Sequence, residues 1–209
     1  MEQINIPATK SNLIHLKEEL AFAKEGLELL NEKKEILISQ ISFLSSKVDR
    51  VRERVNRDLM TAYSYLKRAM AEYGEASVEA AGLGVRARER VHLSERSLMG
   101  VVLPIVSIDI PEFRPQYSLY GTGKEVDDTA IAVHEAMEAV GELAELEVGM
   151  ERLFAELRKT LKRINALGHI YVPMYSATVR KMEETLEEKE REALFQMKRI
   201  RSKRRGSVV

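Results

Sequence analysis

The chain lacks cysteine and tryptophan altogether, and only five of its 209 residues are proline. The absence of cysteine excludes disulfide bonds, thiol catalysis and thiolate metal sites, and it fits a reducing compartment. No stretch of about 18 apolar residues occurs, so no direct membrane insertion is expected. The first residues, Met1 to Pro7, lack the basic and apolar regions of a signal peptide. These features predict a cytoplasmic protein.

An excess of charge of either sign is also absent, because 33 basic residues balance 33 acidic ones. A neutral chain has no overall attraction to nucleic acid or to an acidic membrane. Basic residues do gather near the C-terminus, but no aromatic residues are interleaved with them. We interpret this segment as a solvated or partner-facing tail and expect no nucleic-acid partner. Its members are Lys198, Arg199, Arg201, Lys203, Arg204 and Arg205.

Catalytic and cofactor motifs are missing as well. The four histidines are scattered, with no pair at helical spacing that could share a metal ion. The sequence Gly-Thr-Gly-Lys at residues 121–124 lacks the four residues that separate the glycines of a phosphate-binding loop. The carboxylates of residues 183–192 alternate with basic residues, as on a solvated helix face. We therefore predict no enzyme activity, no cofactor and no metal.

Apolar residues that step by three and four from Leu13 to Val55 are the strongest pattern in the chain, and only Lys34 interrupts them with a charge. This spacing is typical of a helix that supercoils around another helix. It predicts a helix over residues 11–79, capped by Ser11. The predicted seam of this helix includes Leu13, Leu16, Leu20, Leu27, Leu30, Leu37, Ile41 and Leu44.

A second apolar run predicts a helix from Asp127 or Asp128 to residue 205, distorted at Pro173 because proline removes one helical hydrogen bond. Two matching runs in one chain favour an intramolecular antiparallel pair, while a homodimer seam is the alternative. The second seam includes Leu153, Leu157, Ile164 and Leu167, and it is expected to continue through residues such as Val140, Leu161, Met197 and Ile200.

Glycines and prolines concentrate in residues 80–126 and should end the first helix. Residues 85–93 and 101–110 are rich in β-branched residues or alternate in polarity, which predicts a short hairpin with an exposed edge. The sequence thus predicts an all-α fold, a long antiparallel two-helix coiled coil with a small central β-hairpin insert. Its expected parts are helix 1–79, insert 80–126, helix 127–205 and a disordered tail 206–209.

Several short motifs, in order, resemble the family of central-stalk D subunits of V-type and archaeal A-type rotary ATPases. The second helix carries Lys-Arg-Ile-Asn-Ala-Leu at 162–167 followed by Val172-Pro173, and later an acidic-basic run that leads into Phe195. The first helix carries Ala-x-x-Gly-x-x-Leu-Leu at 23–30. Gly100, Val101 and Pro104 match the family's central Gly-x-x-x-Pro segment.

This resemblance implies a non-catalytic rotor shaft inside a hexamer of A and B subunits. It also implies that the F subunit binds the lower shaft, where we place Gly100, Val101 and Pro104, and that a C/d-type subunit links the shaft to the membrane rotor ring. The family places the end of the second helix inside the hexamer, which assigns hexamer contacts to Arg191, Lys198, Arg199 and Arg201. The protein would then be cytoplasmic and peripheral to the membrane as part of the ATPase.

A second function is compatible with the same helices. A cytoplasmic coiled-coil adaptor or tether that never rotates would show the same heptads and the same neutral, charged surface. Finding the chain in a complex without other ATPase components would favour this alternative. Neighbouring genes that encode nucleotide-binding A and B subunits would favour the rotor.

Overall fold

The computed structural model describes residues 6–85, 89–111, 114–118 and 120–206. In chain order the elements are helix α1 (Lys10–Tyr73), helix α2 (Glu75–Gly84), strands β1 (Arg90–Leu98) and β2 (Val101–Asp109), helix α3 (Lys124–Ala166), the π-helical turn η1 (Leu167–Tyr171) and helix α4 (Val172–Gly206). The predicted fold class, long helices with a two-stranded antiparallel insert, is confirmed. The chain forms two compact units, Ile36–Leu157 and the two remaining terminal segments.

Helix α1 begins one residue before the predicted Ser11, at Lys10, and Thr9 caps it instead. The hydroxyl of Thr9 accepts a hydrogen bond from the Asn12 amide at 3.2 Å, and its carbonyl accepts one from the Leu13 amide at 3.0 Å. Helix α3 likewise begins at Lys124, ahead of the predicted Asp127 or Asp128.

The predicted continuous helix over residues 11–79 is wrong at its end, because α1 stops at Tyr73 and α2 starts at Glu75. Between them Gly74 has a φ of 82°, a left-handed conformation that glycine adopts without steric cost. The chain therefore breaks the helix here without any proline. The predicted disordered tail lies outside the described residues from Ser207 onward, and Gly206 is the last residue of α4.

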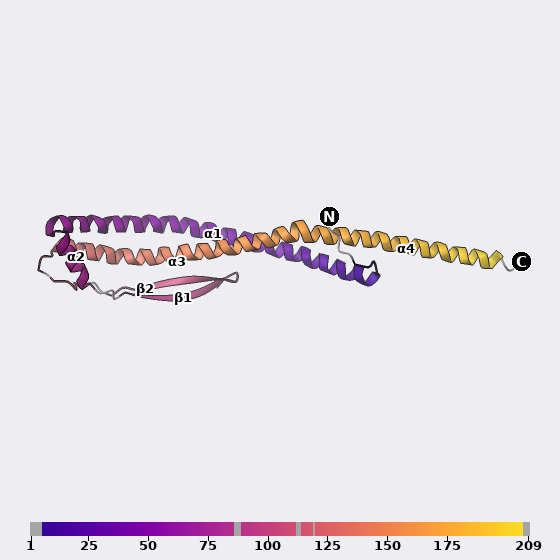
Figure 1. Cartoon of the computed structure of the whole chain (residues 1–209), viewed down its shortest axis with the longest axis horizontal. Coiled ribbons are helices and arrows are strands. Elements are labelled where there is room, and N and C mark those ends of the chain that lie inside the picture. Colours follow the sequence, from indigo (N-terminus) through magenta and orange to yellow (C-terminus); the bar gives the residue numbers. More distant parts are fainter. Residues whose placement is uncertain (1–5, 86–88, 112–113, 119, 207–209) are drawn as a thin grey trace. The chain divides into compact units, whose positions relative to one another are not determined.

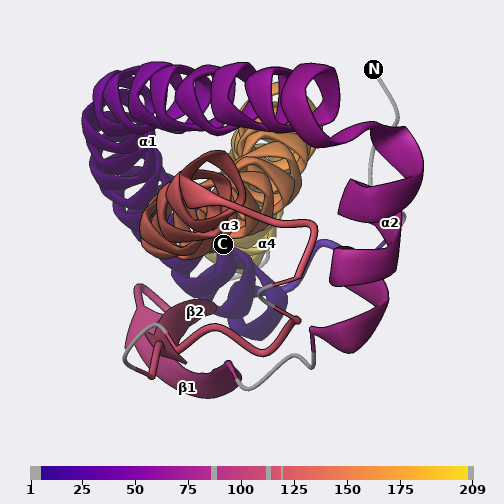
Figure 2. The ribbon, with the colours of Figure 1, turned by 90° about the vertical axis from the view of Figure 1, so that its left-hand side faces the viewer.

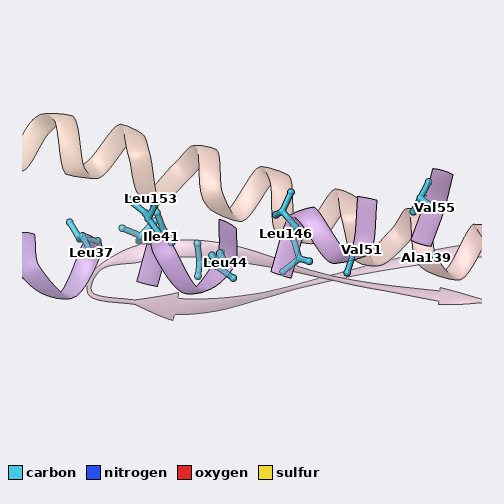
Figure 3. Close-up of a cluster of buried hydrophobic side chains, with 11 residues drawn as sticks. Leu37, Ile41, Leu44, Val51, Val55, Ala139, Leu146 and Leu153 are labelled. Carbon is cyan, nitrogen blue, oxygen red and sulfur yellow. The ribbon is translucent and has the colours of Figure 1, made fainter. Parts of the chain in front are cut away.

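In the unit Ile36–Leu157, α1 and α3 run antiparallel. Arg52 pairs with Glu147 at 2.8 Å, and further along α1 the Tyr73 hydroxyl donates to Glu125 at 2.9 Å, earlier along α3. Figure 1 shows the two helices alongside each other. Between them lies one hydrophobic cluster, shown in part in Figure 3, whose buried members are Leu37, Ile41, Leu44, Val48, Val51, Val55, Val101, Leu103, Ala139, Leu146 and Leu153.

Strands β1 and β2 pair without interruption from Leu98 opposite Val101 to Arg90 opposite Asp109. A two-residue turn joins them, and both of its residues, Met99 and Gly100, have a positive φ, of 52° and 79°. This turn geometry matches the twist of paired strands. The first strand, predicted over 85–93, lies instead at Arg90–Leu98, and residues 86–88 lie outside the described residues.

The hairpin is held to α3 through the outer edge of β2, the strand nearer to α3 in Figure 2. The Glu145 carboxylate accepts a hydrogen bond from the Val106 amide at 3.0 Å, and the Arg152 guanidinium donates to the Val102 carbonyl at 2.8 Å. A buried glycine of α3 lets the strand approach closely. A Cβ on Gly141 would lie 2.6 Å from Cδ1 of Ile108, so this position excludes a side chain.

The second unit contains the start of α1, the end of α3 and α4. Lys10 pairs with Glu190 at 2.7 Å and Lys17 with Glu183 at 2.6 Å, a step of seven residues in opposite directions along α1 and α4. The helices are therefore antiparallel here too. The buried residues between them are Leu16, Val179 and Met182.

Pro173 distorts the second long helix without ending it, as predicted. The distortion is the π-helical turn Leu167–Tyr171, immediately ahead of the proline. Because Pro173 has no amide hydrogen, the carbonyl of His169 loses its usual partner four residues on, and a wider turn accommodates this. The chain then continues as α4.

Four predicted seam positions are wrong, because Val140 is 37% exposed, Leu161 38%, Met197 59% and Ile200 57%. Ala139 and Thr160 are buried in place of the first two. The last two lie beyond Glu190, the residue of α4 that pairs with Lys10 at the start of α1, so no residue of α1 is left to cover them.

Candidate functional site

The end of α4, residues 187–206, is here called the α4 tip. Every one of its side chains that the structure describes, from residue 187 to residue 202, is exposed. Large apolar side chains are among them: Leu194 is 55% exposed, Phe195 70%, Met197 59% and Ile200 57%. Several exposed large apolar residues on one helix end are typical of a surface that another protein covers.

Cationic groups surround these apolar side chains. Arg191 contacts Glu187 on the same helix at 3.7 Å, a weak pair at helical spacing. For Lys198, Arg199 and Arg201 the described part of the chain shows no ion pair. The side chains of Lys203, Arg204 and Arg205 lie outside the described residues. The tip therefore offers long, flexible charges together with apolar contact area.

The hairpin provides a second candidate surface, and the structure separates the three residues predicted to bind a partner there. Gly100 is exposed in the turn, Pro104 is half-buried, and Val101 is only 8% exposed because its side chain belongs to the hydrophobic cluster. Val101 therefore acts through packing, whereas the turn around Gly100 is open to contact.

Strand β1 contains none of the predicted site residues, yet it is the most exposed element of the hairpin. Eight of its nine residues are exposed, and Leu98 is half-buried. Val91 is 59% and Leu93 73% exposed, although both have apolar side chains. The alternation of apolar and polar residues in β1 is visible in the sequence, but it indicates one buried face that the structure does not contain.

A third cluster lies where α1 ends and α3 begins. The Tyr73 hydroxyl lies over Gly123, where a Cβ would be 2.0 Å from Oη, and it donates to Glu125 at 2.9 Å. This hydrogen bond raises the pKa of Tyr73 to about 12. The backbone amide of Glu125, and then Tyr73, lower the pKa of the Glu125 carboxyl. Burial, followed by a hydrogen bond to Asp127, raises the pKa of Tyr117.

The Tyr73 hydrogen bond should make stability depend on pH at the alkaline end. The neutral phenol is favoured in the folded chain, so its contribution is complete below pH 10 and is lost as the pH rises towards about 12. We expect the thermal midpoint to fall in this window and to fall less in Tyr73→Phe. Tyrosinate absorbance measured alongside should lose a late-titrating component in the variant. An unchanged titration would contradict the hydrogen bond.

Metal or membrane sites do not emerge from this arrangement. Among the described residues, no three histidine, aspartate or glutamate side chains come together as metal ligands would. Within the same residues, every helix is too short or too polar to cross a bilayer. What the surfaces can do chemically is bind other proteins.

The comparisons with known proteins agree with one another. The sequence matches the family of ATP synthase D subunits over residues 12–202. It is 32% identical over 200 residues to the D subunit of the V-type ATP synthase of Thermotoga neapolitana, covering 96% of this chain and 98% of that protein. It is 30% identical over 206 residues to the D subunit of the A-type ATP synthase of Thermococcus kodakarensis, covering 96% and 95%.

Proposed function

Because the chain belongs to the family of D subunits of V-type and A-type ATP synthases, we propose that it is the central rotor shaft of such a complex. It would transmit torque between a catalytic hexamer of A and B subunits and the membrane rotor ring. The observation that carries this proposal is the α4 tip, a helix end that continues past its partner helix with apolar and cationic side chains exposed.

A rotor shaft must resist twisting, and the paired helices supply that resistance. Within the unit Ile36–Leu157 the seam is continuous from Leu37 to Val55 on α1, and its side chains are close-packed against α3. Twisting one helix against the other would open this seam and expose apolar area to water. Ion pairs at the rim, such as Arg52 with Glu147, fix the register.

A shaft must also turn within its bearing without binding tightly at any angle. The described α4 tip combines apolar side chains with Arg191, Lys198, Arg199 and Arg201, whose long side chains can exchange carboxylate partners. Each such contact contributes little, so no single angle is strongly favoured. Hydrolysis in the hexamer would change which of its faces complements the tip, and that difference in binding free energy would appear as torque.

The remaining partners follow from the family. We assign the F subunit to the hairpin region around Gly100, Val101 and Pro104, and a C/d-type subunit to the connection with the rotor ring. The chain itself would be non-catalytic and would work at the membrane surface only as part of the complex. Its contribution is mechanical, and the nucleotide chemistry belongs to the hexamer.

The experiment that tests this assignment removes the α4 tip and measures ATP-driven ion pumping by the reassembled complex. Pumping should be largely lost, because the truncated shaft no longer engages the hexamer. Undiminished pumping would exclude the tip as the bearing contact.

A further inference from the structure

The two edges of the hairpin differ in a way that the packing of the chain does not explain. In the two-residue hairpin, Leu98 and Val101 form the hydrogen-bonded pair that closes the turn, and such pairs then recur at every second residue. The backbone groups of Val102, Pro104, Val106 and Ile108 therefore point away from β1. Those of Val91, Leu93, Glu95 and Ser97 point away from β2.

The outer edge of β2 is closed. Glu145 accepts the Val106 amide, Arg152 donates to the Val102 carbonyl, and between them stands Pro104, which has no amide to offer. Proline at an outward position is one of the features that block further strand pairing.

The outer edge of β1 has none of these features. Its nine residues pair with β2 without a bulge, it contains no proline, and the described residues include no partner for its outward amides and carbonyls. Flat, regular edges of this kind accept an additional strand. From this difference we infer that β1 binds an extended segment of another protein of the complex as a third strand, and that this segment alternates acidic with apolar residues.

The side chains of β1 define that chemistry. Arg90, His92 and Arg96 share one face of the strand, and none of them forms an ion pair with any described residue. Acidic residues in the added strand would stand directly opposite them, where opposite charges stabilise a sheet. On the other face Val91 and Leu93, 59% and 73% exposed, would be covered by apolar residues.

A second copy of this chain fits the edge poorly. In the centred antiparallel pairing of two β1 strands, His92 of each copy faces Arg96 of the other. The next register on one side sets Arg90 against Arg96, and the next on the other side sets Glu95 against Glu95. Like charges directly opposite each other destabilise a strand pair. The edge therefore discriminates against self-association and favours a partner of opposite charge.

The inference rests on the proposed membership of an ATP synthase complex, and residue-resolved hydrogen exchange tests it. The complex is purified by a tag on this chain and compared with the free chain. We expect the amides of Val91, Leu93, Glu95 and Ser97 to exchange at least ~100-fold more slowly in the complex. The Val106 amide, already bonded to Glu145, serves as the internal control because it should be protected in both.

Two variants test the chemistry. Leu93→Pro removes an outward amide without removing a β1–β2 hydrogen bond, and Leu93→Thr keeps that amide as the matched control. Only the proline variant should lose a partner protein when the complex is purified. The charge reversal Arg90→Glu with Arg96→Glu should weaken retention of the same partner at least ~10-fold through like-charge repulsion. Protection of Val106 in the free variants verifies that the hairpin is intact.

Several results would overturn the inference. Equal exchange of the outward β1 amides in the complex and in the free chain would show that the edge stays open. Protection that rises with the concentration of the free chain alone would identify a second copy as the occupant. Undiminished retention after charge reversal would exclude an acidic segment. Absence of the other ATP synthase proteins from the purified complex would instead contradict the proposed function, so the two failures are distinguishable.

Discussion

Leu153→Asp should unfold the unit Ile36–Leu157 at temperatures where the unchanged chain is folded. Leu153 is 0% exposed, and Figure 3 shows its side chain directed at that of Ile41 on the facing helix. A carboxylate at this position loses the apolar contacts and has no described cation to pair with inside the cluster. The expected loss is about 3–5 kcal/mol of unfolding free energy, a large fraction of the stability of a typical domain.

The adjacent residue provides the control. Phe154 is 42% exposed, so Phe154→Asp introduces the same charge on the same turn of α3 without burying it fully. Circular dichroism during heating should show a much lower midpoint for Leu153→Asp than for Phe154→Asp. Similar midpoints for the two variants would show that the α1–α3 seam does not hold the helices together.

Truncation after Leu186 should largely abolish ATP-driven pumping by the complex while leaving the chain folded. This cut retains the buried Met182 and the pair of Lys17 with Glu183, so the α1–α4 contacts are mostly preserved. It removes the α4 tip with all of its exposed apolar side chains and its cations. Because the tip is the proposed bearing contact, torque should fall at least ~10-fold, as expected when many weak contacts are lost together.

Single substitutions in the tip are the matched controls. Arg191→Ala and Arg199→Ala should each reduce pumping less than about twofold, because exposed ion pairs contribute little individually. Hydrolysis by the A and B hexamer should survive the truncation in part, since the catalytic groups are proposed to lie there. If Arg191→Ala alone abolished hydrolysis, the residue would be a catalytic arginine and the shaft assignment would fail.

The helices and their facing seams could be predicted from the sequence because a heptad repeat is a local signal. The same signal contains the correction to two of the wrong seam positions. Steps of four and three from Ala139 through Leu153 lead to Thr160, not to Leu161, and both Ala139 and Thr160 are buried. Each of these small residues stands beside a larger apolar one, Val140 or Leu161, whose hydrophobicity outweighs the spacing when burial is predicted from residue type.

The docking of the hairpin could not be predicted, because it depends on contacts between distant residues. Glu145 and Arg152 lie 39 and 50 residues from the strand groups that they bind, and nothing local distinguishes them from other charges on α3. Gly141 carries no local signal either, since its role is visible only from the position of Ile108. The exposed α4 tip could be predicted as a partner contact only through the family resemblance.

Rotation of this chain relative to the catalytic hexamer is the measurement that tests the central claim most directly. The chain contains no cysteine, so Leu83→Cys, at a side chain 86% exposed on α2, accepts a single fluorophore. With the hexamer immobilised, single-molecule fluorescence polarisation should show stepwise, unidirectional rotation when ATP is added. A fixed orientation while ATP hydrolysis continues would contradict the rotor and identify the chain as a stationary tether.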